Sequence, residues 1–587
     1  MKKAIAAIIY CTIICCINAA VAKAPADMDT RFNAYKESFI LELWKIYPTW
    51  ASSVGYHKYD NMLVVPDEQS RAHEMDFCNN NLAILKGFKL NDLADVNKTD
   101  YHLIENQLQY TIWTIKAQKT YEWDPSSYNV SSSFADMLGN DYEPLEARLH
   151  NFARKMEMIP AYYEAAKKNI KNPTKEHTYL AIEQNMGGIS VFTTELDNAI
   201  AKAPKLDQAD RAKLRVTAER AVAAITGYAA WLRSLPNEHP RDFRLGKDLY
   251  EQKFNYEMQS GYSAAEIYRK ALQHKEDLHT KMFAITGQLW PKYCAGKRMP
   301  ADKQQAIKQM IDVLSLNHVQ PDSFQSTIQQ TLPGLVDFIK AKNLIYIDPS
   351  KPLVVRKEPA YMAGVAGASI NSPGPYDKNG NTYYNVGGLE GWDKDKAESY
   401  LREYNHYILQ ILNIHEAIPG HYTQLVYANQ SPSIIKAILG NNAMIEGWAV
   451  YTERMMLENG YDVDRGNTSR EASPEMWLMY YKWNLRSTCN TILDYSVHTR
   501  NMSKKEAMDL LTTEAFQQQA EAEGKWKRVS VTQVQLCCYF TGYTEIYDLR
   551  EDIKAKAGKD FNLKQFHEKF LGYGSAPVKY IRQLMLK

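Results

Sequence analysis

Two histidines and two glutamates in the C-terminal half of the chain have the types and the spacing of a catalytic zinc site. The segment HEAIPGH, residues 415–421, is followed by Glu446 in the segment EGWAVYTE. Imidazole and carboxylate groups are the usual ligands of catalytic zinc, and a glutamate beside a ligand histidine can act as general base. The pattern therefore predicts His415, His421 and Glu446 as ligands of one Zn²⁺ per chain, with Glu416 as the base.

The spacing of the two histidines differs from that of the HExxH motif, in which they lie four residues apart on one helix face. Here they lie six residues apart, and a regular helix of about 100° per residue would turn them away from each other. Pro419 cannot continue helical hydrogen bonding, and Gly420 can adopt a left-handed or otherwise strained backbone. We expect a helix from about 396 to 418, a Pro-Gly bulge, and a new helix from His421. The alternative is a kinked helix with two unrelated histidines.

Further carboxylates and an imidazole could support this centre. Glu453 follows Glu446 by about two helical turns, so it could orient a ligand histidine or be an ordinary solvated charge. Asp494 and His498 lie at i and i+4 near the end of a predicted helix over 476–497, so their side chains can share a face. That pair could be a carboxylate-oriented imidazole of an active site or a surface ion pair.

Three motifs also carry a family resemblance. HEAIPGH, EGWAVYTE and QLCCYFTG, with the N-terminal stretch YPTWASSVGYHKYDNMLV, resemble the bacterial domain-of-unknown-function 885 family over most of the chain. That family is similar to the mainly helical zinc oligopeptidases and carboxypeptidases, which implies a zincin-like fold more firmly than a particular reaction. Two positions depart from the family pattern, Tyr422 in place of a second histidine and Asn490 in place of an arginine. The second departure bears on any role that depends on that arginine.

Hydrolysis at a single metal ion also requires a donor to the carbonyl oxygen on which negative charge develops. Tyr539 and His498 are the candidates for this role. Gln535 lies four residues before Tyr539, and helical spacing lets the two side chains face the same way.

Between about 343 and 388 the sequence changes to β-branched and aromatic runs and a Gly/Ala/Ser-rich passage. This texture predicts a small sheet with a strand over 382–386, just before the metal-binding segment. An edge strand there would pair with an extended substrate through main-chain hydrogen bonds, and a purely structural hairpin is the equal alternative. Tyr383 and Tyr384 of this strand are further candidates for the wall that faces a substrate.

The remainder of the chain has helical periodicity. Apolar residues recur at spacings of three and four from Asp29 to about Lys342, and helices are also predicted over 509–522 and 531–554. No Pro/Gly/Ser-rich linker interrupts the chain. We expect a mainly α protein in two lobes, a helical N-terminal lobe over 23–342 and a metal-binding lobe with a small sheet over 343–587.

The first residues have the form of an export signal. Two lysines precede an apolar run that ends in Ala-Val-Ala at 20–22, so residues 1–22 are predicted to be a secretory signal peptide. A membrane anchor is the alternative, but the run contains Asn18. Cys15 and Cys16 lack the small preceding residue that a lipoprotein site requires. We therefore expect a periplasmic or secreted protein without stable membrane insertion.

Charge and cysteine content exclude other classes. Removal of two signal-peptide lysines reduces 70 basic residues to 68, which balance 68 acidic ones, so no electrostatic reason favours nucleic acid or anionic lipid as a partner. The five cysteines beyond the signal permit one or two disulfides, and without a CxxC motif they do not predict zinc ligation: Cys78, Cys294, Cys489, Cys537 and Cys538.

Together these features predict a zinc metallopeptidase that hydrolyses short peptides or a small amide in a cleft between two helical lobes. A zinc-dependent hydrolase of another amide or ester would use the same residues. A non-catalytic helical protein that binds a peptide is the third possibility, and it would hold no stoichiometric metal.

Overall fold

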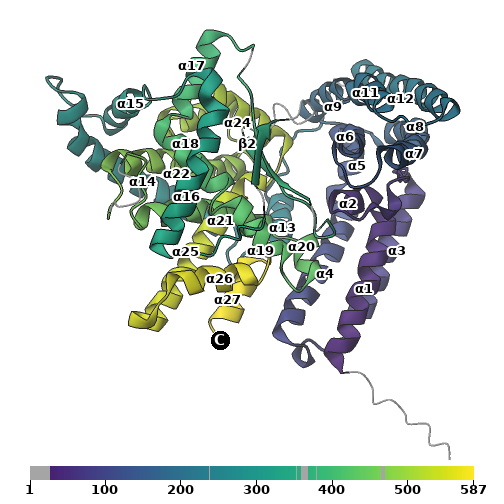
Figure 1. The fold of residues 1–587 in the computed structure, drawn as a ribbon, viewed down its shortest axis with the longest axis horizontal. Coiled ribbons are helices and arrows are strands. Elements are labelled where there is room, and N and C mark those ends of the chain that lie inside the picture. The colour runs from purple at the N-terminus through teal and green to yellow at the C-terminus, as the bar shows by residue number, and fades with distance from the viewer. Residues whose placement is uncertain are drawn as a thin grey trace, which may run out of the picture.

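The computed structural model describes residues 27–236, 238–351, 353–358, 368–377, 380–389, 391–464 and 470–587. The predicted signal peptide lies outside these ranges. The described chain is mainly helical and contains one small sheet (Figure 1), as the apolar periodicity predicts. None of the helices in these ranges combines the length and the apolar content that a membrane span requires.

The N-terminal helices build two hydrophobic cores. The first surrounds Phe32 and Trp44 and is completed by a short helix from the C-terminal half. Its helices are α1 (Met28–Ile46), α2 (Pro48–Ser53), α3 (Glu68–Leu85), α4 (Asp95–Trp113) and α20 (Ile434–Ile438).

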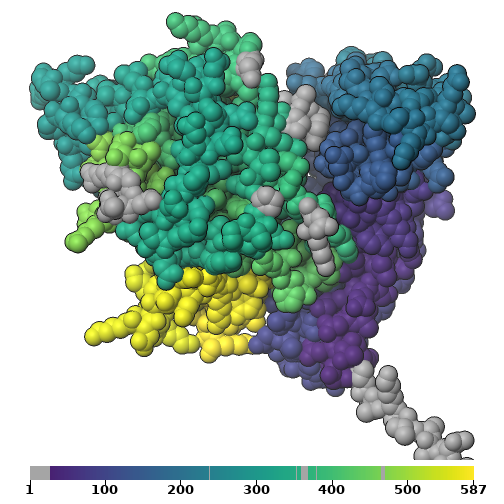
Figure 2. All heavy atoms as spheres, viewed as in Figure 1, coloured from purple at the N-terminus to yellow at the C-terminus, as the bar shows by residue number. Residues whose placement is uncertain are grey.

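The second core surrounds Phe152 and Tyr228. In the space-filling view its helices, in blue, stand apart from the teal body at the top of the molecule and meet the rest of the protein below (Figure 2). They are α6 (Ser131–Gly139), α7 (Leu145–Met156), α8 (Ile159–Asn169), α9 (Lys175–Gly187), α10 (Ile189–Phe192), α11 (Thr194–Ala201) and α12 (Gln208–Ser234), which α5 (Thr120–Trp123) precedes.

A third and much larger core joins residues from 243 onward with the C-terminal helices. Its first members are α13 (Lys247–Met258), α14 (Ala264–Tyr293), α15 (Lys303–Leu314) and α16 (Phe324–Lys342). These four helices bury their apolar faces in the same core as the segments that carry the candidate site, so they pack against the part of the chain predicted as the second lobe. Periodicity shows that a helix has an apolar face, but not which distant helix covers it.

The C-terminal half of this core contains the segments that carry the candidate site. They are α17 (Lys394–Glu403), α18 (His406–Glu416), α19 (His421–Asn429), α21 (Asn442–Glu458), α22 (Pro474–Arg500), α23 (Lys504–Asp509), α24 (Gln519–Val531), α25 (Cys538–Ala557), α26 (Leu563–Gly572) and α27 (Val578–Met585).

Three helix boundaries differ from those predicted. The helix expected from 396 to 418 is broken at Asn405, whose side chain accepts hydrogen bonds from the first amides of α18 and so caps a new helix. The helices expected over 509–522 and 531–554 end elsewhere, because Phe516 and Val534 have φ values of 54° and 71°. A helix cannot continue through such residues, and α24 fills the interval between them.

The sheet has the order β1-β3-β2. Strand β3 (Thr382–Val386) coincides with the predicted strand, runs parallel to β1 (Leu353–Lys357) and antiparallel to β2 (Ala368–Asn371). Because β3 is paired on both sides, it cannot accept a substrate as an edge strand, and that prediction is wrong.

Close helix packing sets the position of α21. A Cβ atom on Gly447 would lie 2.4 Å from the Cα of Gly542 in α25, so only glycine permits this approach.

The five cysteines are all buried free thiols, and the disulfides that the sequence permits do not form.

Candidate metal centre

The predicted interruption between the two histidines is present. Helix α18 ends at Glu416 and α19 begins at His421. Between them the amide of Ile418 donates to the carbonyl oxygen of Asn413 at 3.1 Å, five residues back instead of four, and the peptide bond before Pro419 is cis. The regular helical ladder is therefore replaced by a compact bulge.

Gly420 serves this bulge through its size. Its φ is −72° and its ψ is −128°, so it does not use the left-handed backbone, which was one of the two alternatives that we expected. A Cβ atom there would lie 1.8 Å from the carbonyl oxygen of His415 and 2.3 Å from that of Ile414, which no side chain tolerates. The indole of Trp448 in α21 donates to the carbonyl oxygen of Pro419 at 2.9 Å, which ties the bulge to the helix that carries Glu446.

The bulge brings the two imidazoles together. Their ring centroids lie 4.8 Å apart with the planes nearly perpendicular. Oε2 of Glu446 lies 3.2 Å from Nε2 of His421 and 3.7 Å from Nε2 of His415. Ligands of a tetrahedral zinc ion at its usual bond lengths lie about 3.4 Å apart. In the described chain, this is the only group of three such residues whose ligand atoms converge.

The hydrogen bonding of Glu446 agrees with a metal ligand. Its Oε2 is buried and has no hydrogen-bond partner, which is costly for a carboxylate oxygen unless a cation satisfies it. Although burial opposes ionisation, the two imidazoles hold the pKa of Glu446 well below its usual range. The three side chains keep 9–17% exposure, so two imidazole nitrogens and one carboxylate leave an accessible position, as in catalytic rather than structural zinc sites.

Glu453 supports the first histidine from behind. Its Oε1 lies 2.7 Å from Nδ1 of His415 and accepts a hydrogen bond from the indole of Trp483 at 2.9 Å. Glu453 is fully buried. A carboxylate at Nδ1 fixes the proton on that nitrogen and leaves Nε2 free to coordinate. The structure therefore places Glu453 where the two-turn spacing from Glu446 indicates.

Glu416 is the last residue of α18 and is partly exposed. Burial raises the pKa of its carboxyl group, and the charges of His421, His415 and Arg486 act in the opposite direction. The charges of both predicted ligand histidines therefore act on the Glu416 carboxylate, and its role as general base stays a prediction.

Gln535 and Tyr539 face the same way, as predicted. Both accept hydrogen bonds from Nη2 of Arg528, at 2.7 and 3.3 Å. Burial and the negative charge of Glu446 raise the pKa of Tyr539 above its usual value, so the phenol keeps its proton close to a metal ligand. Tyr539 remains the candidate donor to a substrate carbonyl oxygen.

Asp494 and His498 form hydrogen bonds with backbone groups and do not join the candidate metal centre. Both are fully buried, and the Asp494 carboxylate accepts hydrogen bonds from the amides of Val534 and Leu536 at 3.0 and 2.9 Å. Nε2 of His498 donates to the carbonyl oxygen of Val529 at 3.0 Å. The pair thus holds the turn between α24 and α25, and His498 has no Nε2 proton to offer a substrate.

The two tyrosines of β3 also support the fold. Tyr384 is fully buried and donates to Oδ1 of Asn413 at 3.0 Å, which attaches α18 to the sheet. Tyr383 points to the other face, where the guanidinium of Arg356 lies 3.8 Å from its ring centroid. Full burial removes Tyr384 from a wall that faces a substrate. Tyr383 is half-buried, and for this residue the role stays a prediction.

Sequence analysis missed a basic group beside the centre. Glu521, Lys525 and Arg528 lie on α24, and Arg486 of α22 reaches them. Because α24 spans the point where we expected a break, the spacing i, i+4, i+7 of the first three was overlooked. That spacing was the signal that could have found them.

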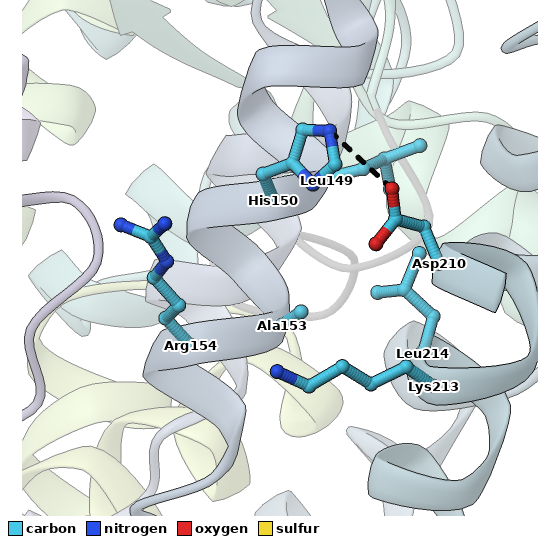
Figure 3. Close-up of a pocket in the computed structure, with 7 residues that line it drawn as sticks. All are labelled: Leu149, His150, Ala153, Arg154, Asp210, Lys213 and Leu214. Carbon is cyan, nitrogen blue, oxygen red and sulfur yellow. Dashed lines mark ion pairs between the residues drawn. The ribbon is translucent and has the colours of Figure 1, made fainter. Parts of the chain in front are cut away.

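A separate surface pocket of about 120 Å³ lies between α7 and α12 (Figure 3). There His150 and Asp210 form an ion pair at 3.8 Å, with side chains 51% and 37% exposed. The other polar side chains, Arg154 and Lys213, extend away from the pair (Figure 3). This is an ordinary solvated ion pair and not a second metal centre.

Fold and site together define a mainly helical protein with a histidine–glutamate cluster at a break between two helices. The chain belongs to the DUF885 family, described as bacterial protein of unknown function, whose family model matches residues 48–585. No curated protein matches it.

Two solved structures are similar to this chain. The first, "a putative lipoprotein of unknown function" from Shewanella oneidensis, shares 51% identity over 95% of this chain and all of that one, with a TM-score of 0.84. The second, "the putative lipoprotein" from Colwellia psychrerythraea, shares 16% identity over 95% of this chain and 99% of that one, with a TM-score of 0.77. The second likeness concerns the fold alone.

Proposed function

We propose that this protein is an exported zinc metallopeptidase with a zincin-like, two-lobed helical fold that hydrolyses short peptides. The observation that carries the proposal is the convergence of His415, His421 and Glu446 around a buried carboxylate oxygen that has no hydrogen-bond partner. A zinc-dependent hydrolase of another amide or ester would use the same arrangement and is the alternative.

The residues of the chain divide the work of such a reaction. His415, His421 and Glu446 would hold one Zn²⁺, which when bound polarises a carbonyl group and lowers the pKa of water. Glu453 holds the proton on Nδ1 of His415. The Glu416 carboxylate would take a proton from water and return it to the leaving amine nitrogen.

Tyr539 would complete the site from the opposite wall. Its phenol keeps a proton and contacts Arg528, so it can donate to the carbonyl oxygen as negative charge develops there. A phenol does so without the repulsion that a carboxylate would add.

Export is supported by two independent observations. Residues 1–22 have the pattern of a secretory signal peptide, and the Shewanella oneidensis relative is described as a lipoprotein. Cys15 and Cys16 lack the usual small preceding residue, so we propose a periplasmic or secreted location without a lipid anchor.

Metal content and peptide cleavage test the proposal together. Purified residues 23–587 should hold about one zinc ion per chain and cleave components of a synthetic peptide library, with products identified by mass spectrometry. Glu416→Gln should keep its zinc and lose cleavage by about 10²–10⁴-fold. A protein without stoichiometric metal, or one whose cleavage is indifferent to Glu416, would instead support the non-catalytic binding protein.

A further inference from the structure

One face of α24 meets Arg486 to form a basic wall, defined by Arg486, Lys525 and Arg528. Nη2 of Arg486 lies 2.6 Å from Oε1 of Glu521. The Lys525 ammonium lies 3.9 Å from the same oxygen, beyond hydrogen-bond distance. Arg486 and Lys525 thus share the carboxylate of Glu521.

The pairing within this wall is incomplete. The Arg528 guanidinium donates to two neutral acceptors, the amide oxygen of Gln535 and the phenol of Tyr539. Lys525 is only 5% exposed, and a buried ammonium without a close counter-ion is unfavourable unless it has a functional partner. Burial, aided by the charges of Arg486 and Arg528, lowers the pKa of Lys525 to about 7, although Glu521 and Glu446 act in the opposite direction.

The basic wall faces the candidate metal centre. Arg528 is bonded to Tyr539, the proposed donor to the substrate. The charge of Glu446 acts on Lys525 and on Arg528, and the charge of Arg486 acts on Glu416. The wall therefore lies next to Tyr539 and within electrostatic reach of the candidate metal centre.

We propose that the basic wall binds a carboxylate of the substrate and so selects peptides that carry one next to the scissile bond. This inference rests on the proposed function and names its substrate class. A peptide can supply the carboxylate from its C-terminus or from an Asp or Glu side chain. In the first case, the anchored chain end directs cleavage to a bond close to the C-terminus.

Lys525→Met is the variant that tests the wall. Methionine has a similar length without charge, and replacing a poorly paired buried charge by an apolar side chain is often neutral for stability. The probes are two N-acetylated random pentapeptide pools, identical except that one has free C-terminal carboxylates and the other C-terminal amides. Wild type should cleave the free-acid pool at least about 30-fold faster, since removing one partner of a buried ion pair has an effect of that order.

The substitution should abolish this preference by slowing cleavage of the free-acid pool to the rate of the amidated pool. Arg500→Gln is the matched control, because Arg500 lies on the same helix as Arg486 but stacks over Tyr268. It should keep the wild-type preference. A wild-type preference for Asp or Glu in both pools, lost in Lys525→Met, would assign the carboxylate to a side chain.

Two results would overturn the inference. One is equal cleavage of all acidic and neutral peptides by wild type, and the other is a preference that Lys525→Met retains. If wild type cleaves neither pool, the proposed function fails. Calorimetric titration of both pools into zinc-loaded wild type and Lys525→Met then tests separately whether the basic wall binds a carboxylate. Tighter binding of the free-acid pool by wild type only supports it, and equal binding or none contradicts it.

Discussion

The cluster of His415, His421 and Glu446 and the pair of Asp494 and His498 both bring imidazole and carboxylate groups together in the interior. They differ in what their polar atoms contact. In the first, three potential ligand atoms face one another and the carboxylate oxygen has no hydrogen-bond partner. In the second, both carboxylate oxygens accept backbone amides and the imidazole Nε2 donates to a backbone carbonyl.

The presence of imidazole and carboxylate groups alone therefore does not separate a candidate ligand set from a structural pair. The two groups are separated by whether their polar side-chain atoms form hydrogen bonds with backbone groups. His498 also has one unpartnered atom, Nδ1, but the group of converging ligand atoms does not include it. A metal site requires several such atoms directed at one point.

The largest expected effect is a difference in zinc content between a variant of the ligand cluster and a variant of the structural pair. His421→Ala should empty the site, because it removes one of three ligands. Asp494→Asn removes only contacts to the turn between α24 and α25, and should retain about one zinc per chain. Plasma emission spectrometry of the dialysed proteins measures both, and loss of zinc in Asp494→Asn would join the two regions that we have separated.

Turnover provides the next test, at the wall that Tyr539 shares with the metal centre. Tyr539→Phe should lower kcat by about 10²–10³-fold without loss of zinc, because one donor to the developing charge is removed. Tyr543→Phe is its control, one helical turn further on α25, where the phenol contacts Arg454 instead. Equal activity of Tyr539→Phe and wild type would remove Tyr539 from the mechanism.

The free energy of unfolding should depend on pH because of the buried His498. Burial lowers the pKa of His498 to about 4, below about 6.5 in an unfolded chain. The unfolded state therefore binds the proton first, and stability present above pH 6.5 is lost as the pH falls towards 4, by up to about 3 kcal/mol.

His498→Gln keeps a side-chain donor but cannot titrate. Its free energy of unfolding, measured in denaturant from pH 7 to 4, should fall less steeply than that of wild type. Parallel curves for the two proteins would show that His498 is not held neutral by the fold.

The smallest effect concerns Glu453, which touches a ligand without being one. Glu453→Gln should weaken zinc affinity by about 10–100-fold in a chelator competition titration, since it removes the charge behind His415. Glu458→Gln, on the same helix but paired with Arg454 and Arg550, should leave affinity unchanged. If Glu453→Gln empties the site as completely as His421→Ala does, the third ligand has been misassigned.

Local patterns carried most of what the sequence could predict. Proline and glycine between the two histidines indicate the bulge because both act on neighbouring backbone atoms. The relation of Glu446 to Glu453 follows from helical spacing alone. The strand over 382–386 and most of the helices are likewise set by local periodicity.

The errors concern partners that are distant in the chain. Nothing near Asp494 indicates that its carboxylate caps amides forty residues later. The central place of β3 depends on β1 and β2, which precede it, and the packing of α14 depends on α22. Lys525 and Arg528 were missed because Phe516 and Val534, rather than any glycine or proline, set the ends of α24.

Helix α21 fixes the positions of four residues of the candidate site relative to one another. Along one rigid segment it presents Glu446 to the ligand position, Trp448 to the bulge and Glu453 to the back of His415, while Gly447 seats it on α25. One residue inserted at the start of this helix would rotate all four by about 100°. Sequence change in this stretch is thus confined to substitution, and a homologue of altered length here would have lost the whole centre at once.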